Sequence, residues 1–234
     1  MKTHHVAVLG ISVVAAAFLL GVFFYAARVP DDVISVVGAA TKRLESDVVK
    51  WRITLRRSIG PDELSMGYRM IQDDLEFLKG MLHDNGVADE DITVQPATAQ
   101  QRHDRYGVLS SYDVNQGIFV ISKDIDTVEK LALNPVGITD TGVIIEASNL
   151  QYLYSGLDEM KIELLAAATE NARLRAGEIT RNSGASLGKV KHLRSGVFQI
   201  REPFSTEVRD YGMYSTQTRQ KEITVTVSAA YRIN

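Results

Sequence analysis

The sequence lacks cysteine altogether and has only five prolines in 234 residues. Without cysteine the chain has no disulfides, thiolate zinc sites, iron–sulfur clusters or cysteine nucleophiles. A lipid-modified cysteine is excluded as well, so any membrane attachment must come from the polypeptide itself. The compartment stays open, because a cysteine-free chain suits oxidising and reducing environments alike.

Excess charge is also missing. The formal net charge is -3, which gives no electrostatic case for a nucleic-acid partner. The hydrophobic share of 45% and the charged share of 24% are ordinary for a folded globular protein. Composition therefore indicates a folded chain and excludes a low-complexity or disordered one.

Catalytic and metal-binding patterns are scarce. The segment Gly184-Ala185-Ser186-Leu187-Gly188 matches the G-x-S-x-G pattern of serine hydrolases. That chemistry needs a strand before the serine and a helix after it, whereas here a predicted helix precedes Ser186 and a predicted strand follows it. The five histidines have no metal-ligand spacing, and no ladder of calcium ligands occurs. We expect no catalytic residues, no cofactor and no metal site; a hydrolase using Ser186 with His192 is the enzymatic alternative.

One long hydrophobic run dominates the N-terminus. No charged residue occurs from Val6 to Ala27, and a helix of this length is roughly 33 Å long, enough for the roughly 30 Å core of a bilayer. We expect a signal anchor over residues 6–28, with lipid around its apolar side chains: Val6, Leu9, Val13, Phe18, Leu20, Phe23 and Ala27. A cleaved leader, whose apolar stretch is usually shorter, and a buried core helix are the alternatives.

The flanking charges give little guidance on orientation. Lys2 precedes the span and Arg28 follows it, so the positive charges are nearly balanced. A short head of residues 1–5 is easily left in the cytoplasm. We therefore expect a single-pass protein of the inner membrane, with residues 29–234 as one domain in the periplasm or outside the cell.

After the span, strand and helix patterns alternate. Apolar alternation predicts strands over residues 33–40, 47–57, 92–98, 107–122, 143–154, 190–201 and 223–231, with polar connections over 95–106 and 202–220. Helices are expected from Pro61 to about Asn85, over a short segment beginning near Asp126, and from Leu157 to Asn182. The fold class is α+β: a mixed or antiparallel sheet packed by two long amphipathic helices and preceded by a transmembrane helix.

Apolar side chains form a stripe along each long helix. On the second, the predicted inner face consists of Met160, Leu164, Ala168, Ala172, Ala176 and Ile179. On the first, the stripe recurs at steps of four and three: Leu64, Tyr68, Ile71, Leu75, Leu78 and Leu82. That spacing serves either the core against a sheet or a helix–helix seam in an oligomer.

The strand over residues 47–57 has an apolar face and a basic face. Lys50, Arg52 and Arg56 lie on the basic side. A solvated sheet surface is the ordinary interpretation. The functional alternative is a face that binds an envelope protein or anionic lipid.

The order of these elements resembles the SIMPL-domain family. The resemblance covers residues 33–233, and its most specific part is the alanine-rich helix followed by Gly184-Ala185-Ser186-Leu187-Gly188-Lys189-Val190. Other shared features are Ile34-Ser35-Val36-Val37-Gly38, the turn Gly86-Val87-Ala88-Asp89-Glu90-Asp91-Ile92, and the closing strand Ile223-Thr224-Val225-Thr226-Val227. The polar segment 95–106 and an anchor in place of a cleavable leader depart from the family pattern.

The resemblance implies an envelope location without established enzymatic activity, ring- or channel-like oligomers in some members and a link to oxidative-stress tolerance in others. Our hypothesis is a membrane-anchored, non-enzymatic domain that acts as a homo-oligomer. The alternative is a binding module, monomeric or dimeric, that presents its basic strand face to a partner.

Overall fold

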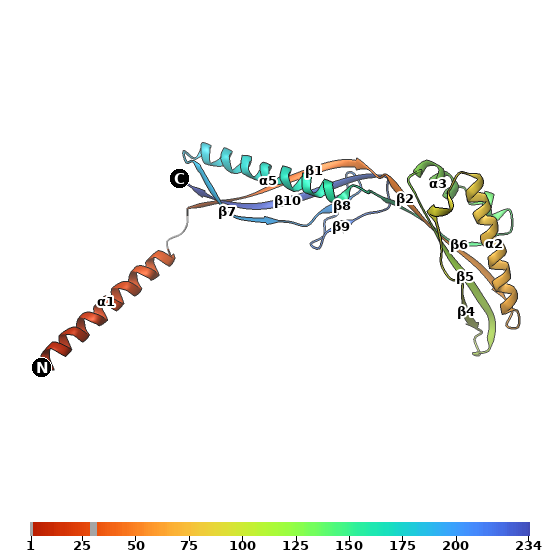
Figure 1. Cartoon of the computed structure of the whole chain (residues 1–234), viewed down its shortest axis with the longest axis horizontal. Coiled ribbons are helices and arrows are strands. Elements are labelled where there is room, and N and C mark those ends of the chain that lie inside the picture. The colour runs from red at the N-terminus through yellow and green to blue at the C-terminus, as the bar shows by residue number, and fades with distance from the viewer. Residues whose placement is uncertain (1, 29–31) are drawn as a thin grey trace. The chain divides into compact units, whose positions relative to one another are not determined.

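The structure is a computed structural model that describes residues 2–28 and 32–234, with side chains described for residues 5, 8–25 and 32–234. The chain begins with the helix α1 (Lys2–Arg28) (Figure 1). The described residues cluster into two compact units. One unit combines residues up to 38 with 169–194 and 227–234, and the other combines 39–168 with 195–226.

Beyond α1, the described residues form strands and helices that confirm the α+β class. The elements are β1 (Val33–Glu45), β2 (Val48–Ile59), α2 (Leu64–Asp84), β3 (Ile92–Val94), β4 (Thr98–His103), β5 (Leu109–Ser122), α3 (Ile125–Ala132), α4 (Val136–Thr139), β6 (Ile145–Leu153), α5 (Leu157–Asn182), β7 (Leu187–Ser195), β8 (Gln199–Arg201), β9 (Met213–Tyr214) and β10 (Gln220–Ile233). They form two sheets. One has the order β1-β10-β8-β9 with β7 also on β10, and the other has the order β3-β5-β2-β6 with β4 on β5.

The sheet around β2 is antiparallel and holds the larger core. Trp51 lies opposite Val120 of β5 and Leu150 of β6. The predicted alternation on β2 is confirmed, because Val49, Trp51, Ile53 and Leu55 are all buried. Figure 1 shows α2 and α3 on one side of this sheet, and their apolar residues complete the core. The basic side of β2 therefore lies on the opposite face of the sheet.

Helix α2 begins at Leu64, three residues later than predicted from Pro61. The Glu63 side chain accepts a hydrogen bond from the Gly60 backbone N–H at 3.2 Å, and the Glu63 N–H donates to the Gly60 carbonyl at 3.1 Å. These bonds hold residues 60–63 in a turn, so the proline lies in the turn and not in the helix.

Glycine 67 sets the approach of α2 to the sheet. A Cβ atom at this position would lie 2.8 Å from Ile59 Cγ1 and 2.9 Å from Val114 Cγ2. Both distances are too short for a carbon–carbon contact, so only glycine permits this packing. A Cβ atom added to Gly80, by contrast, would lie in open space.

The apolar stripe of α2 packs within the chain. Ile71, Leu78 and Leu82 are buried in the core, and Leu64 and Leu75 pack against it. Only Tyr68 keeps a largely exposed side chain, at 39%. The core interpretation of the stripe accounts for this burial, which leaves little of the stripe as surface for a helix–helix seam.

Helix α5 buries a straight row of residues at steps of four. Met160, Leu164, Ala168, Ala172 and Ala176 are buried as predicted, but Ile179 is 52% exposed. Thr180 continues the row instead, and its hydroxyl donates to the Ala176 carbonyl at 3.0 Å. In the unit that contains the end of α5, Ala172 and Ala176 pack with Val36, Ala229 and Tyr231.

Two connections differ from the sequence predictions. Residues 95–106 were expected as a polar connection, yet β4 pairs with β5 in that segment. The turn between β4 and β5 is held by Asp104, whose carboxylate accepts from the N–H groups of Tyr106 and Val108. The single strand predicted over 190–201 is two strands. The break falls near Gly196, where β7 ends and β8 pairs with residues 222–224 of β10.

Candidate functional site

The predicted membrane span is a helix with an exposed apolar surface. Residues 8–25 have a mean hydropathy of 2.4, and none of them is buried within the chain. Among the predicted lipid-facing residues, the exposed fractions of Leu9, Val13, Phe18, Leu20 and Phe23 lie between 61% and 72%. The side chains of Val6 and Ala27 lie outside the described residues. This helix is long and apolar enough to cross a membrane.

The predicted basic face lies on the side of β2 away from α2. The Lys50 ammonium lies 4.6 Å from the centre of the Phe119 ring, and the Arg52 guanidinium lies 5.7 Å from the same ring. Phe119 is directly opposite Arg52 on β5. Within the described residues, neither cation has a carboxylate within 4.0 Å. Their charge is therefore available at the surface.

Arg56, the third residue of this face, is already paired. Its guanidinium contacts the Asp113 carboxylate at 2.9 Å and the Glu146 carboxylate at 3.4 Å. Asp113 is fully buried and also binds Arg102. Burial by itself would raise the pKa of Asp113, but hydrogen bonds from Arg102, Arg56 and Ser58 outweigh it, so the pKa is lowered. Arg56 thus belongs to a structural ion-pair cluster, and Lys50 and Arg52 carry the available charge.

Ser186 and His192 are not arranged as a catalytic pair. The Ser186 hydroxyl donates to the Asn234 carbonyl at 3.2 Å, between the end of α5 and the start of β7. His192 lies on β7, six residues further along. An extended strand spans about 3.3 Å per residue, so the two side chains are roughly 20 Å apart. A proton transfer between them has no geometric basis.

Among the residues that the structure describes, no three His, Asp or Glu side chains come close enough together to hold a metal ion. His83 instead contacts the Asp89 carboxylate at 3.0 Å on the surface, beside Lys79.

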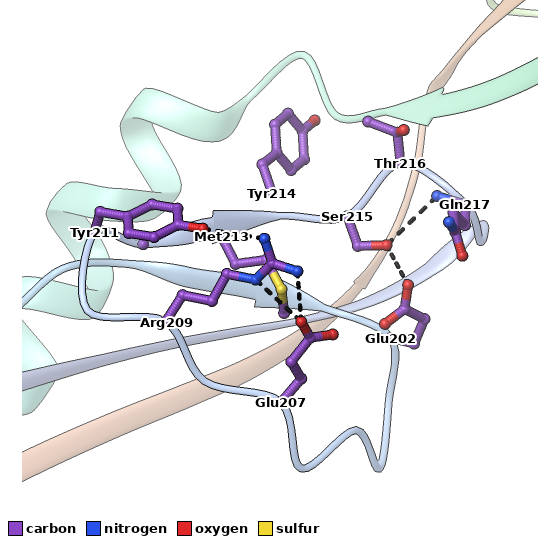
Figure 2. Close-up of a pocket in the computed structure, with 10 residues that line it drawn as sticks. Glu202, Glu207, Arg209, Tyr211, Met213, Tyr214, Ser215, Thr216 and Gln217 are labelled. Atoms are coloured by element: carbon purple, nitrogen blue, oxygen red, sulfur yellow. Dashed lines mark hydrogen bonds and ion pairs between the residues drawn. The ribbon is translucent and has the colours of Figure 1, made fainter.

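A polar cleft that the sequence reasoning missed lies in the connection between β8 and β10. It has a volume of about 470 Å³ and is lined by residues 202, 207, 209 and 211–217. Figure 2 shows the ion pair between Glu207 and Arg209 beside Tyr211, and the Ser215 hydroxyl donating to Glu202. Arg209 also donates to the Tyr211 hydroxyl at 3.1 Å. Carboxylates, a guanidinium and two tyrosines therefore share one cleft.

The cleft is held in shape by buried polar groups. The Gln199 amide donates to the Arg209 carbonyl at 2.6 Å and accepts from the Arg209 N–H at 3.4 Å. The buried Lys221 ammonium donates to the carbonyls of Ser215 and Thr218 at 2.7 and 3.0 Å. These bonds satisfy groups that burial would otherwise penalise, so they fix the loop against the sheet.

Burial and charge oppose each other beneath the cleft. Burial lowers the pKa of the Lys221 ammonium, and the nearby Glu202 carboxylate acts in the opposite direction. The hydrogen bond from Ser215 is the main reason that the pKa of Glu202 is lowered. The lowered pKa of Glu202 keeps its carboxylate ionised at neutral pH. Sequence reasoning missed this cleft because the segment has no periodicity; the one available signal was Tyr211 and Tyr214 among alternating acids and bases.

Comparison with known proteins identifies relatives. Residues 34–231 match the sequence model of SIMPL, described as a protein of unknown function (DUF541). Over 163 residues, the chain is 26% identical to the interleukin-1 receptor-associated kinase 1-binding protein 1 homolog of Xenopus laevis. This alignment covers 70% of the present chain and 62% of the relative, less than two thirds of the relative's length. Because the family match spans most of the sequence, the chain belongs to the SIMPL family.

Proposed function

We propose that this protein is a non-enzymatic binding module held at a membrane by α1. The observation that carries the proposal is the exposed apolar surface of residues 8–25, none of which is buried in the chain. Such a surface is costly in water and favourable in lipid. The name of the Xenopus relative refers to binding a receptor-associated kinase, which supports binding, rather than catalysis, as the general mode of action.

Membrane fractionation tests the anchor. The full chain should stay in the membrane pellet after washing at alkaline pH, which strips peripheral proteins. A variant carrying Val13→Lys and Phe18→Lys should move to the soluble fraction, because each lysine near the centre of a span costs about 2.5–3.5 kcal/mol. The matched control is Lys50→Gln, which leaves the span intact. Wild-type protein in the soluble fraction would overturn the proposal.

Location and orientation belong to the same proposal. The head, residues 1–5, stays in the cytoplasm, and the SIMPL domain lies beyond the inner membrane. A reporter that is active only outside the cytoplasm, fused after Asn234, should be active. A cytoplasmic reporter at the same position should be inactive, and the reverse pattern would contradict this orientation.

Self-association is the mode of action that we propose for the exported domain, with envelope-stress tolerance as its physiological setting. The support is the outer strand β1, which is paired on one side only in the order of its sheet. Exposed strand edges favour pairing with another chain. Sizing of the detergent-solubilised protein at micromolar concentration should give an oligomer, whereas a strict monomer would contradict self-association.

A separate observation supports a second mode of action, binding through the basic face of β2. Lys50 and Arg52 present positive charge over Phe119 without a neighbouring carboxylate within the described residues. This arrangement favours an acidic envelope partner or anionic lipid. Because α1 would hold every variant on any vesicle, the readout is the excess of protein retained on vesicles with anionic lipid over vesicles with neutral lipid alone, and Lys50→Glu with Arg52→Glu should abolish this excess. The reversal of Arg69, an exposed residue of α2, is the control, and an equal excess for all variants would dismiss this mode.

A further inference from the structure

The charged side chains that line the cleft between β8 and β10 already have partners within it. The carboxylate of Glu207 pairs with the guanidinium of Arg209, and the carboxylate of Glu202 accepts a hydrogen bond from Ser215. A cationic ligand would meet the guanidinium, and an anionic ligand would meet the two carboxylates. Either ion would be repelled as well as attracted, so the charge pattern favours an uncharged ligand.

The cleft also offers both kinds of hydrogen-bonding group. The Tyr211 hydroxyl accepts from Arg209, and the Tyr214 hydroxyl accepts from the Tyr154 N–H at 3.2 Å, so both retain a proton to donate. In the described part of the chain, the Thr216 hydroxyl and the Gln217 amide have no side-chain hydrogen bond. The carboxylates of Glu207 and Glu202 keep lone pairs for further donors. A ligand with many hydroxyl groups can use donors and acceptors together.

The cleft also contains aromatic side chains, in addition to its hydrogen-bond donors and acceptors. Tyr211 is 78% exposed, and Figure 2 shows it beside the ion pair of Glu207 and Arg209, whereas Tyr214, 41% exposed, points away from that pair. The exposed face of a tyrosine ring is apolar and can pack on an apolar surface of a ligand. The C–H face of a sugar ring is apolar and its rim is rich in hydroxyls, so it matches a tyrosine face surrounded by planar polar groups.

We propose that this cleft is a binding site for an uncharged saccharide. The ring of Tyr211 stacks on the sugar, while Glu207 and Gln217 bind its hydroxyl groups. Gln199 and Lys221 are positioning residues, because they hold the loop through backbone atoms and do not reach the ligand. This site is separate from the anchor, and ligand binding there does not depend on the membrane location. The ligand is either a free sugar or part of a polymeric glycan.

Calorimetric titration of the full chain tests the site, in a detergent without a sugar headgroup. The probes are cellotetraose, maltotetraose and chitotetraose, each with its monosaccharide. At least one should bind saturably. Tyr211→Ala should weaken that binding about tenfold, and Tyr211→Phe should weaken it less than about threefold, because the ring remains. Preference for the tetramer over its monosaccharide indicates a polymeric glycan, and equal binding indicates a free sugar.

The control variant is Tyr106→Ala, which removes another tyrosine, 75% exposed, outside the cleft. It should leave saccharide binding unchanged, and circular dichroism should be the same for all variants. The proposal is overturned if no probe binds at about 10 mM. It is also overturned if Tyr211→Ala binds as wild type does, or if spermidine or inorganic phosphate binds more tightly than every saccharide.

Discussion

Arg57 on β2 and Asp74 on α2 form a two-pronged ion pair across the core. Arg57 Nε lies 2.6 Å from Asp74 Oδ2, and Arg57 Nη2 lies 2.6 Å from Asp74 Oδ1. Both side chains are mostly buried, with exposed fractions of 19% and 7%. The hydrogen bonds that Arg57 donates to the Asp74 carboxylate raise the pKa of Arg57. This pair fixes the helix to the sheet by geometry as well as by charge.

Asp74→Asn should lower the free energy of unfolding by about 3 kcal/mol, because it leaves the guanidinium buried without its counter-charge. Urea denaturation of the detergent-solubilised chain at neutral pH measures the change. Asp73→Asn, an exposed neighbour on the same helix, should change stability by less than about 0.5 kcal/mol. Equal effects of the two substitutions would show that the pair adds nothing specific.

Asp113 should govern stability at acid pH. Its pKa is lowered below the ordinary 3.8, so the unfolded state binds more protons just below that value. Its contribution is therefore complete above about pH 4 and is lost as the pH falls through the folded-state pKa. Asp113→Asn should flatten the acid limb of a thermal-denaturation profile between about pH 2 and 6, whereas Asp62→Asn should retain the limb. An unchanged limb in Asp113→Asn would contradict this role.

The two glycines of α2 should respond oppositely to alanine. Gly67→Ala should destabilise the protein by about 1–3 kcal/mol, since the new methyl group collides with Ile59 and Val114. Gly80→Ala should stabilise it by about 0.5–1 kcal/mol, because alanine favours a helix and the space is open. Denaturant midpoints for the two variants give the comparison. A destabilising Gly80→Ala, or a harmless Gly67→Ala, would contradict the packing of α2.

Substitutions at two residues of the α2 stripe distinguish a stripe that packs in the core from one that forms a helix–helix seam in an oligomer. Leu78→Ala should cost about 2–5 kcal/mol, because it empties a fully buried site. Tyr68→Ala, at the exposed part of the stripe, should cost less than about 1 kcal/mol. Neither substitution should change the mass of the assembly in light scattering if the stripe is core alone. A Leu78→Ala variant with full stability and a reduced mass would instead favour the oligomer seam.

Periodicity predicted most of the fold. The alternation of Val49, Trp51, Ile53 and Leu55 located β2 and its buried face, and steps of three and four located α2. The predicted element boundaries and buried faces were wrong where a single turn contact or long-range contact sets them. Glu63 delays the start of α2 by binding Gly60, and the buried row of α5 ends at Thr180 because the true spacing is four residues.

The candidate sites were less predictable because they depend on contacts between distant residues. The sequence placed Lys50, Arg52 and Arg56 on one face, but it did not reveal that Asp113 and Glu146 neutralise Arg56. The cleft at Tyr211 depends on Gln199 and Lys221, which reach loop backbone atoms that no local pattern identifies. The apolar run of α1 could be predicted from the sequence, since composition and length alone identify a helix that is able to cross a membrane.

The mass of the mature polypeptide isolated from membranes tests the central claim most directly. An uncleaved anchor predicts that the protein recovered from washed membranes retains residues 6–28 and is absent from the soluble fraction. A mature chain that begins after Ala27 and is found in the soluble fraction would contradict the account.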